Sequence, residues 1–108
     1  MDKINAFDAI YQVVREIPSG RVTSYGAIAA YLGMKSGARM VGWAMNASHT
    51  LSDIPAHRVV NRNGVFTGKN FFGENRMQEL LAQEGIAVQH DQIIDFKQFF
   101  WDPSTELA

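Results

Sequence analysis

The chain has 108 residues, of which 46% are hydrophobic and 19% charged, and a formal net charge of −1. This composition is that of an ordinary globular protein rather than a disordered one, and the length fits one domain over residues 1–108. The sequence contains no cysteine, which excludes a disulfide, a thiolate metal site and a thiol nucleophile.

Neither a membrane segment nor a cofactor site is indicated. No apolar run approaches the length that crosses a bilayer. Charged residues near the start, Asp2, Lys3 and Asp8, argue against a signal peptide, so we expect a cytoplasmic location. The histidines are dispersed without metal-ligand spacing, and we therefore expect no metal and no other cofactor.

Charge is distributed unevenly along the chain. Residues 15–76 hold eight Lys and Arg against three Asp and Glu, whereas residues 77–108 hold one against six. A basic middle and an acidic end predict one face for a polyanion. The alternative is that these charges cluster by chance and are all solvated.

The spacing of apolar residues predicts helices over residues 4–17, 25–32, 37–47 and 74–84. Ser24 and Ser36 are the expected N-caps of the second and third helices. Gly33 and Gly85 are expected to end the second and fourth helices in the left-handed conformation. The apolar tail over residues 93–101 is expected to pack back on the body.

The second and third helices are joined by a short turn containing a glycine, which is the helix-turn-helix pattern. Farther along, Val59-Val60 and Val65-Phe66 flank the segment Asn61-Arg62-Asn63-Gly64, and Asn-Gly favours tight hairpin turns. A hairpin after a helix-turn-helix is a wing. The predicted fold class is therefore mainly α with a small β hairpin, a winged helix-turn-helix DNA-binding domain.

The third helix offers one long polar side chain for reading bases, Arg39. Ordinary readers of the major groove carry several such residues on this helix. The small residues around it, such as Gly42, permit the close approach seen in minor-groove binders that insert a side chain between base steps. Arg39 is either such a wedge or a solvated arginine on an exposed face.

Tyr25 stands at the first turn of the second helix, after Ser24. In this position it can contact a phosphate together with the helix N-terminus. The alternative is a partly buried aromatic residue without a binding role.

The segment 54–60 reads Ile-Pro-Ala-His-Arg-Val-Val. His57 and Arg58 enter a buried strand, where polar groups need partners, and Glu84 is the candidate partner. A histidine with a carboxylate can be general acid–base machinery or a structural polar network. Because no nucleophile lies beside it, the sequence favours the structural network.

This segment resembles the active-site segment of the O6-alkylguanine-DNA alkyltransferases, which carry Pro-Cys-His-Arg-Val there. Ala56 stands where the family has its alkyl-accepting cysteine. The resemblance runs from about Phe7 to Gly85, through residues 20–26, 38–42, 55–60, 63–64 and 80–85. Short chains with this core and with Ala or Trp at the cysteine position resemble the alkyltransferase-like proteins. The aromatic tail at residues 101–103 of this chain is also similar to theirs.

The resemblance implies that the domain binds the minor groove and flips an O6-alkylguanine nucleotide into a pocket. In the family, the tyrosine matching Tyr25 helps to rotate the phosphate 3′ to the lesion, and the arginine matching Arg39 replaces the lost base. The DNA-binding residues implied are Tyr25, Arg39, Ser36 and Gly42.

The lesion pocket implied by the same resemblance is formed by Tyr25, Ala56, Val59 and Lys69. His57, Arg58 and Glu84 match the network that activates the cysteine in the enzymes. One departure is Ser48, which stands where the alkyltransferases have an asparagine. It favours the non-enzymatic branch.

The function implied is that of a non-enzymatic damage sensor. It would be a monomer, associated with the nucleoid, that binds double-stranded DNA containing O6-alkylguanine and hands it to the damage-recognition proteins of nucleotide excision repair. One alternative is a base-flipping hydrolase in which His57 and Glu84 activate water. The other is a sequence-specific winged-helix regulator, against which the bare recognition helix argues.

Overall fold

The computed structural model describes residues 6–34, 37–48, 51, 53–65 and 76–107. It is mainly helical with two small sheets. In chain order its elements are α1 (Ala6–Arg15), β1 (Thr23–Ser24), α2 (Tyr25–Leu32), α3 (Gly37–Ala47), the 3-10 helix η2 (Ala56–Arg58), β2 (Val59–Val60), α4 (Arg76–Gln83), β3 (Val88–Gln89), β4 (Gln92–Ile93), α5 (Phe96–Phe99) and α6 (Pro103–Glu106).

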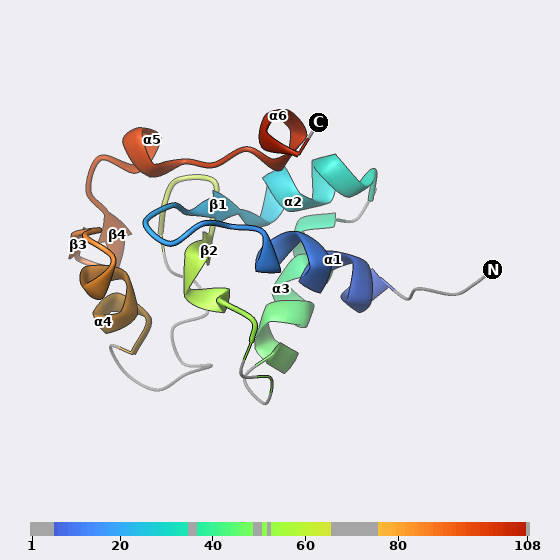
Figure 1. Cartoon of the computed structure of the whole chain (residues 1–108), viewed down its shortest axis with the longest axis horizontal. Coiled ribbons are helices and arrows are strands. Elements are labelled where there is room, and N and C mark those ends of the chain that lie inside the picture. Colours follow the sequence, from blue (N-terminus) through green and yellow to red (C-terminus); the bar gives the residue numbers. More distant parts are fainter. Residues whose placement is uncertain (1–5, 35–36, 49–50, 52, 66–75, 108) are drawn as a thin grey trace.

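The three N-terminal helices gather at one end of the molecule, and α4 with the β3–β4 pair occupies the other (Figure 1). The main hydrophobic core joins α1, α2 and α3, and it includes residues as distant in sequence as Ile54 and Trp101. A second cluster packs α4 against β2 and β4 through Val60, Leu81 and Ile93. None of the helices in the described part of the chain has the length and apolar character to cross a membrane.

The predicted helices are present with small differences at their ends. The first is predicted over residues 4–17 and ends at Arg15, because Glu16 and Ile17 donate to the carbonyls of Val13 and Val14 at 3.0 and 3.1 Å, which tightens the last turn. Its first two predicted residues lie outside the described residues. The third matches residues 37–47, and α4 starts at residue 76, where the described chain resumes.

Three of the predicted caps are confirmed. The Ser24 hydroxyl accepts the Ala27 N–H at 3.0 Å, and Gly33 adopts the left-handed conformation at φ 69°. Gly85 has φ 85° and donates its N–H to Ala82. Ser36, the fourth, lies outside the described residues.

The site is positioned by a parallel strand pair. β1 and β2 pair with Thr23 opposite Val59 and Ser24 opposite Val60. Since α2 begins directly after β1 and the turn at residues 61–64 directly follows β2, this parallel pairing places Tyr25 beside that turn, whereas η2 precedes β2 and lies at the other end of the pair. Two segments more than thirty residues apart in the sequence are thereby brought together.

The predicted hairpin is present in part. The turn at residues 61–64 forms as expected, with Gly64 at φ 77° and the Asn61 side chain accepting the N–H groups of Asn63 and Val65. Its arms, however, find other partners: β2 pairs with β1, and Val65 bridges to Gln92. Phe66 lies outside the described residues. The Asn61 N–H also donates to the Val65 carbonyl at 3.1 Å, so the long-range pairing of the arms is added to a local contact of the predicted hairpin.

The C-terminal tail packs back on the body as predicted. It runs along the molecule from α5 to α6 (Figure 1). The backbone N–H of Trp101 donates to the Val22 carbonyl at 2.7 Å, and the backbone N–H of Val22 donates to the Phe99 carbonyl at 3.0 Å. Trp101 is buried in the main core. The tail is therefore an integral part of the fold.

Candidate functional site

Tyr25 is the first residue of α2 and is half-buried against the main core. Gly26 beside it is exposed. The helix N-terminus is capped by Ser24, whose hydroxyl takes up one of the free N–H groups. The first turn of α2 therefore presents one aromatic side chain and backbone at the surface.

The exposed side of α3 carries Arg39. The helix buries Val41, Ala44 and Met45 against the core, whereas Arg39 on the opposite side is exposed. The start of the helix is held close to α2, since a Cβ on Gly37 would lie 2.0 Å from the Cβ of Ala29. This approach places the first turn of α3 against the second half of α2.

Gly42 lies on the same helix, and apart from its chain neighbours and the adjacent backbone of α3 no described atom lies within 4 Å of the position that a Cβ would occupy. Packing inside the described part of the protein therefore does not require a glycine here. The absence of a side chain leaves the backbone of α3 open to close approach from outside. Ser36, the other predicted DNA-binding residue of this region, lies outside the described residues.

A groove of about 490 Å³ adjoins both helix starts. Tyr25, Gly26 and Ala38 line one side of it, and residues 61–63 line the other. Arg62 is exposed at this edge, although it is absent from the predicted DNA-binding residues. The Asn-Gly signal locates its turn in the sequence, but the neighbour of that turn depends on the β1–β2 pairing.

The predicted lesion-pocket residues are brought together in part. Ala56 and Val59 are 2% and 1% exposed and belong to the core cluster against which Tyr25 packs. The surface above Ala56 is thus closed in this structure. Lys69 lies outside the described residues.

His57, Arg58 and Glu84 form one hydrogen-bonded network. His57 Nε2 lies 2.7 Å from Glu84 Oε2, and Arg58 donates to the same carboxylate through Nε and Nη2 at 2.8–3.1 Å. The Gly20 N–H adds a bond at 2.8 Å, and Arg58 Nη1 reaches the Ile17 carbonyl at 2.9 Å. The carboxylate therefore joins the end of α4 to η2 and to the turn after α1.

The contacts in this network shift the pKa values of Glu84 and His57. Burial raises the pKa of Glu84, but the hydrogen bonds from Arg58, Gly20 and His57 outweigh it and hold that pKa at about 2. Burial lowers the pKa of His57, against the opposing effect of Glu84. His57 is thus neutral at pH 7 and donates its Nε2 proton to the carboxylate.

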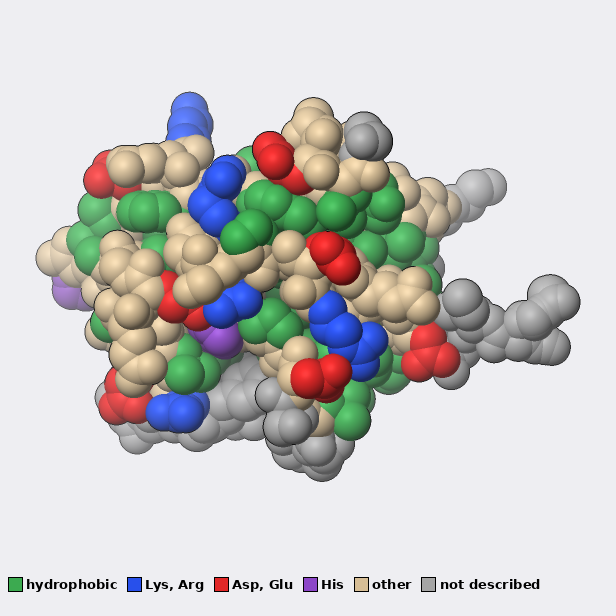
Figure 2. Space-filling view, viewed as in Figure 1, with side chains coloured by type: hydrophobic (Ala, Val, Ile, Leu, Met, Phe, Trp, Pro, Cys, Tyr) green, Lys and Arg blue, Asp and Glu red, His purple; other side chains and the backbone are tan. Residues whose placement is uncertain are grey.

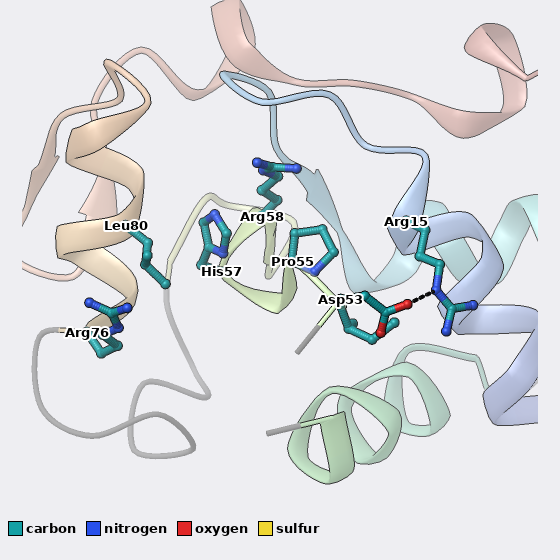
Figure 3. Close-up of a pocket in the computed structure, with 8 residues that line it drawn as sticks. Arg15, Asp53, Pro55, His57, Arg58, Arg76 and Leu80 are labelled. Atoms are coloured by element: carbon teal, nitrogen blue, oxygen red, sulfur yellow. Dashed lines mark hydrogen bonds and ion pairs between the residues drawn. The ribbon is translucent and has the colours of Figure 1, made fainter. Parts of the chain in front are cut away.

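A second hollow, of about 400 Å³, borders this network (Figure 3). His57 and Arg58 line it from η2, and Arg76 and Leu80 line it from α4. On the other side, Arg15 donates to Asp53 at 2.8 Å in an exposed pair of little energetic weight. This hollow and the groove beside Tyr25 share no lining residue.

Charges do not gather by sign on the face drawn in Figure 2. Basic and acidic side chains alternate there over α1, α4 and the segment between them. The uneven charge along the sequence therefore does not make this face a basic patch. Among the described residues, no group of three His, Cys, Asp or Glu is arranged to hold a metal ion.

The network predicts loss of stability in acid. The pKa of Glu84 falls on folding from 4.5 to about 2, so its contribution is complete above pH 4.5 and is lost as the pH falls toward 2. The difference corresponds to about 3 kcal/mol. The pKa of His57 is also lowered from 6.5 on folding, so the unfolded chain gains a proton first and stability begins to fall below pH 6.5.

Urea unfolding at a series of pH values measures both stages. The variant Glu84→Gln should lack the stage below pH 4.5, because it has no carboxyl group to protonate at this position. An equal acid response in the variant and the parent protein would contradict the assignment.

Comparison with known proteins is consistent with this geometry. The family described as the DNA-binding domain of 6-O-methylguanine DNA methyltransferase matches residues 5–86. The alkyltransferase-like protein 1 of Schizosaccharomyces pombe is 36% identical, covering 90% of this chain and 94% of its own. The DNA base-flipping protein of Escherichia coli is 35% identical, covering 94% of this chain and 79% of its own.

A solved structure is similar as well. The crystal structure of the alkyltransferase-like protein from S. pombe, in complex with damaged DNA containing O6-carboxymethylguanine, superposes with a TM-score of 0.77. It is 36% identical and covers 90% of this chain and 94% of the other. The similarity therefore extends over both chains almost in full.

Proposed function

The chain belongs to the family of the 6-O-methylguanine DNA methyltransferase DNA-binding domain, and we propose that it is a non-enzymatic sensor of O6-alkylguanine in duplex DNA. The observation that carries the proposal is Ala56, which occupies the nucleophile position of an otherwise complete segment. A methyl side chain cannot attack an alkyl carbon. The network of His57, Arg58 and Glu84 around it then serves the fold.

The proposed docking surface is a helix-turn-helix made by α2 and α3, with the turn at 61–64 as its wing. The exposed Arg39 and the open backbone at Gly42 support docking into the minor groove, where close approach and one inserted side chain suffice. Ser36 is assigned to the same surface. Arg39 fills the space of the base that leaves the stack.

The damaged nucleotide rotates into a pocket beside Ala56 and Val59, and Lys69, which lies outside the described residues, is assigned to this pocket from the family resemblance alone. Both small side chains are buried here, so a covering group must move to admit the base. Tyr25 is the candidate, because it is half-buried against the same cluster at the edge of the groove. Flipping costs least at a weakly paired base, which favours alkylated guanine over intact guanine.

A lesion that is held without chemistry persists until another protein acts on it. We therefore assign this chain the role of marking the lesion for the damage-recognition proteins of nucleotide excision repair. The proposal includes a monomer in the cytoplasm, associated with the nucleoid. The similar S. pombe protein, solved with damaged DNA, supports the DNA part of this assignment.

Hydrolysis by His57 and Glu84 is disfavoured by their contacts. Glu84 already accepts hydrogen bonds from Arg58 and Gly20, and its pKa of about 2 makes it a weak base. An activated water would have to compete with these partners.

The test is a binding titration with matched duplexes that contain O6-methylguanine or guanine at one position, at stated salt. Protein and DNA are recovered afterwards for mass analysis. Tighter binding to the lesion with both masses unchanged is the expected result. A changed DNA mass would identify an enzyme, and equal binding to both duplexes would leave only a general DNA binder.

Arg62 provides a prediction for the wing. Because it is exposed at the groove beside Tyr25, we expect it to contact a phosphate. Arg62→Ala should weaken binding to damaged and undamaged duplexes by the same factor and lower the slope of log K against log salt by about 1. Titrations at four salt concentrations measure this slope. An unchanged slope would place Arg62 outside the interface.

A further inference from the structure

Trp43 on α3 is exposed to an unusual degree for its size. It is 54% exposed, whereas the other large hydrophobic side chains at the described surface are 38–42% exposed. A single exposed apolar residue is ordinary in itself. The position of Trp43 relative to Arg39 on α3 is what indicates a role in binding.

Trp43 follows Arg39 by one helical turn. Four residues of α-helix advance about 6 Å along the axis and end about 40° from the starting direction. Both residues are exposed, and both lie opposite the buried stripe that contains Val41 and Ala44. Helical side chains lean toward the N-terminus, so the indole of Trp43 extends toward the turn that carries Arg39.

The surface around this pair suits a polyanion. The sequence of α3 contains no acidic residue, and its first turn adjoins the groove bordered by Arg62. Because Ala38 and Gly42 have little or no side chain, another molecule can approach the backbone of this part of α3 closely. A flat aromatic ring that stands out from such a surface can enter a narrow groove.

We propose that Trp43 packs in the DNA minor groove beside the base step that Arg39 opens. Its ring face lies against the deoxyribose walls, and its indole N–H can donate to the acceptors on the base edges. The contact rests on the proposed mode of DNA binding and adds a second anchor to it. Because Trp43 lies one turn away from Arg39, it strengthens binding to damaged and undamaged duplexes alike.

Intrinsic fluorescence tests this contact directly, because the chain contains only two tryptophans. Trp101 is 4% exposed and Trp43 is 54% exposed, so added acrylamide mainly reports on Trp43. Each duplex is titrated while the anisotropy of a label on the DNA records saturation. We expect acrylamide quenching to fall as either duplex saturates the protein, and the change to disappear in Trp43→Phe.

Unchanged quenching at full saturation would overturn the inference. A change in quenching with protein concentration in the absence of DNA would also overturn it, because it would indicate association between copies of the chain. If Trp43 becomes protected by both duplexes but the lesion is not preferred, the contact stands and the proposed damage specificity fails.

Affinity provides the second measurement. Trp43→Ala is expected to weaken binding to both duplexes by about tenfold, the scale of one lost aromatic contact, without changing their ratio. Trp43→Phe should recover part of the loss. Tyr31→Ala is the matched control: this tyrosine is exposed on α2 but lines a hollow with α1 residues Ala9 and Gln12. A loss confined to the damaged duplex, or equal in the control, would overturn the inference.

Discussion

Glu84→Ala is expected to lower the free energy of unfolding by about 3–5 kcal/mol, the cost of leaving a buried ion pair without one partner. Glu84 is 10% exposed and accepts from Arg58, His57 and the Gly20 N–H. The substitution leaves all three donors without the carboxylate that accepts their hydrogen bonds. Since a small domain is stable by only about 5–15 kcal/mol, a large part of its stability depends on this one carboxylate.

Urea unfolding followed by circular dichroism measures the loss. Glu79→Ala is the matched control, because Glu79 lies on the same helix but is 62% exposed and forms a long surface pair with Arg76 at 3.9 Å. Such a surface substitution should change stability by no more than about 0.5 kcal/mol. If the two variants were equally stable, the network would not hold the fold together.

The expected loss of stability also gives this network a role in a chain that contains no cysteine. Its partners come from the turn after α1, from η2 and from the end of α4. In this chain Glu84 contributes to stability whether or not a nucleophile stands at position 56. Replacing Glu84 would therefore lower the stability of this chain even if the network activates no nucleophile.

The helices were predictable because their signals are local. The apolar spacing of α1 and α3, the Ser24 cap and the left-handed Gly33 each depend on neighbours within a few residues. The contact between Glu84 and the His57-Arg58 pair could also be anticipated, since buried polar groups need partners.

The strand pairing was not predictable in the same way. β1 and β2 have two residues each, and a parallel pair between distant segments leaves no pattern in either. The β3–β4 hairpin was missed because its turn residues, His90 and Asp91, adopt positive φ without the usual Asn-Gly pair.

Two residues near the candidate interface were missed for related reasons. The place of Arg62 follows from the strand pairing, which brings its turn to the groove. The exposure of Trp43 contradicts the usual burial of tryptophan. Sequence periodicity shows which face of α3 is apolar, but the degree of exposure depends on what packs against the helix. Residues of this kind are found only from the tertiary structure.

Arg39→Ala is expected to remove most of the preference for damaged DNA while leaving the fold intact. The side chain is exposed, so stability should change by no more than about 0.5 kcal/mol. In the proposed complex it occupies the gap left by the flipped base. Without it the stack around the gap is unsupported, and affinity for the lesion duplex should fall by about tenfold to a hundredfold.

Affinity for undamaged DNA should fall less, because only the general attraction of one positive charge is lost there. Arg39→Lys separates the two contributions: it keeps the charge but not the planar group that can stack between bases, so it should restore undamaged binding and only part of the lesion preference. Arg76→Ala, an exposed arginine on α4 outside the proposed interface, controls for the change in net charge. If Arg39→Ala weakened both duplexes by the same factor, the residue would be a phosphate contact, and the space of the flipped base would have to be filled by another group.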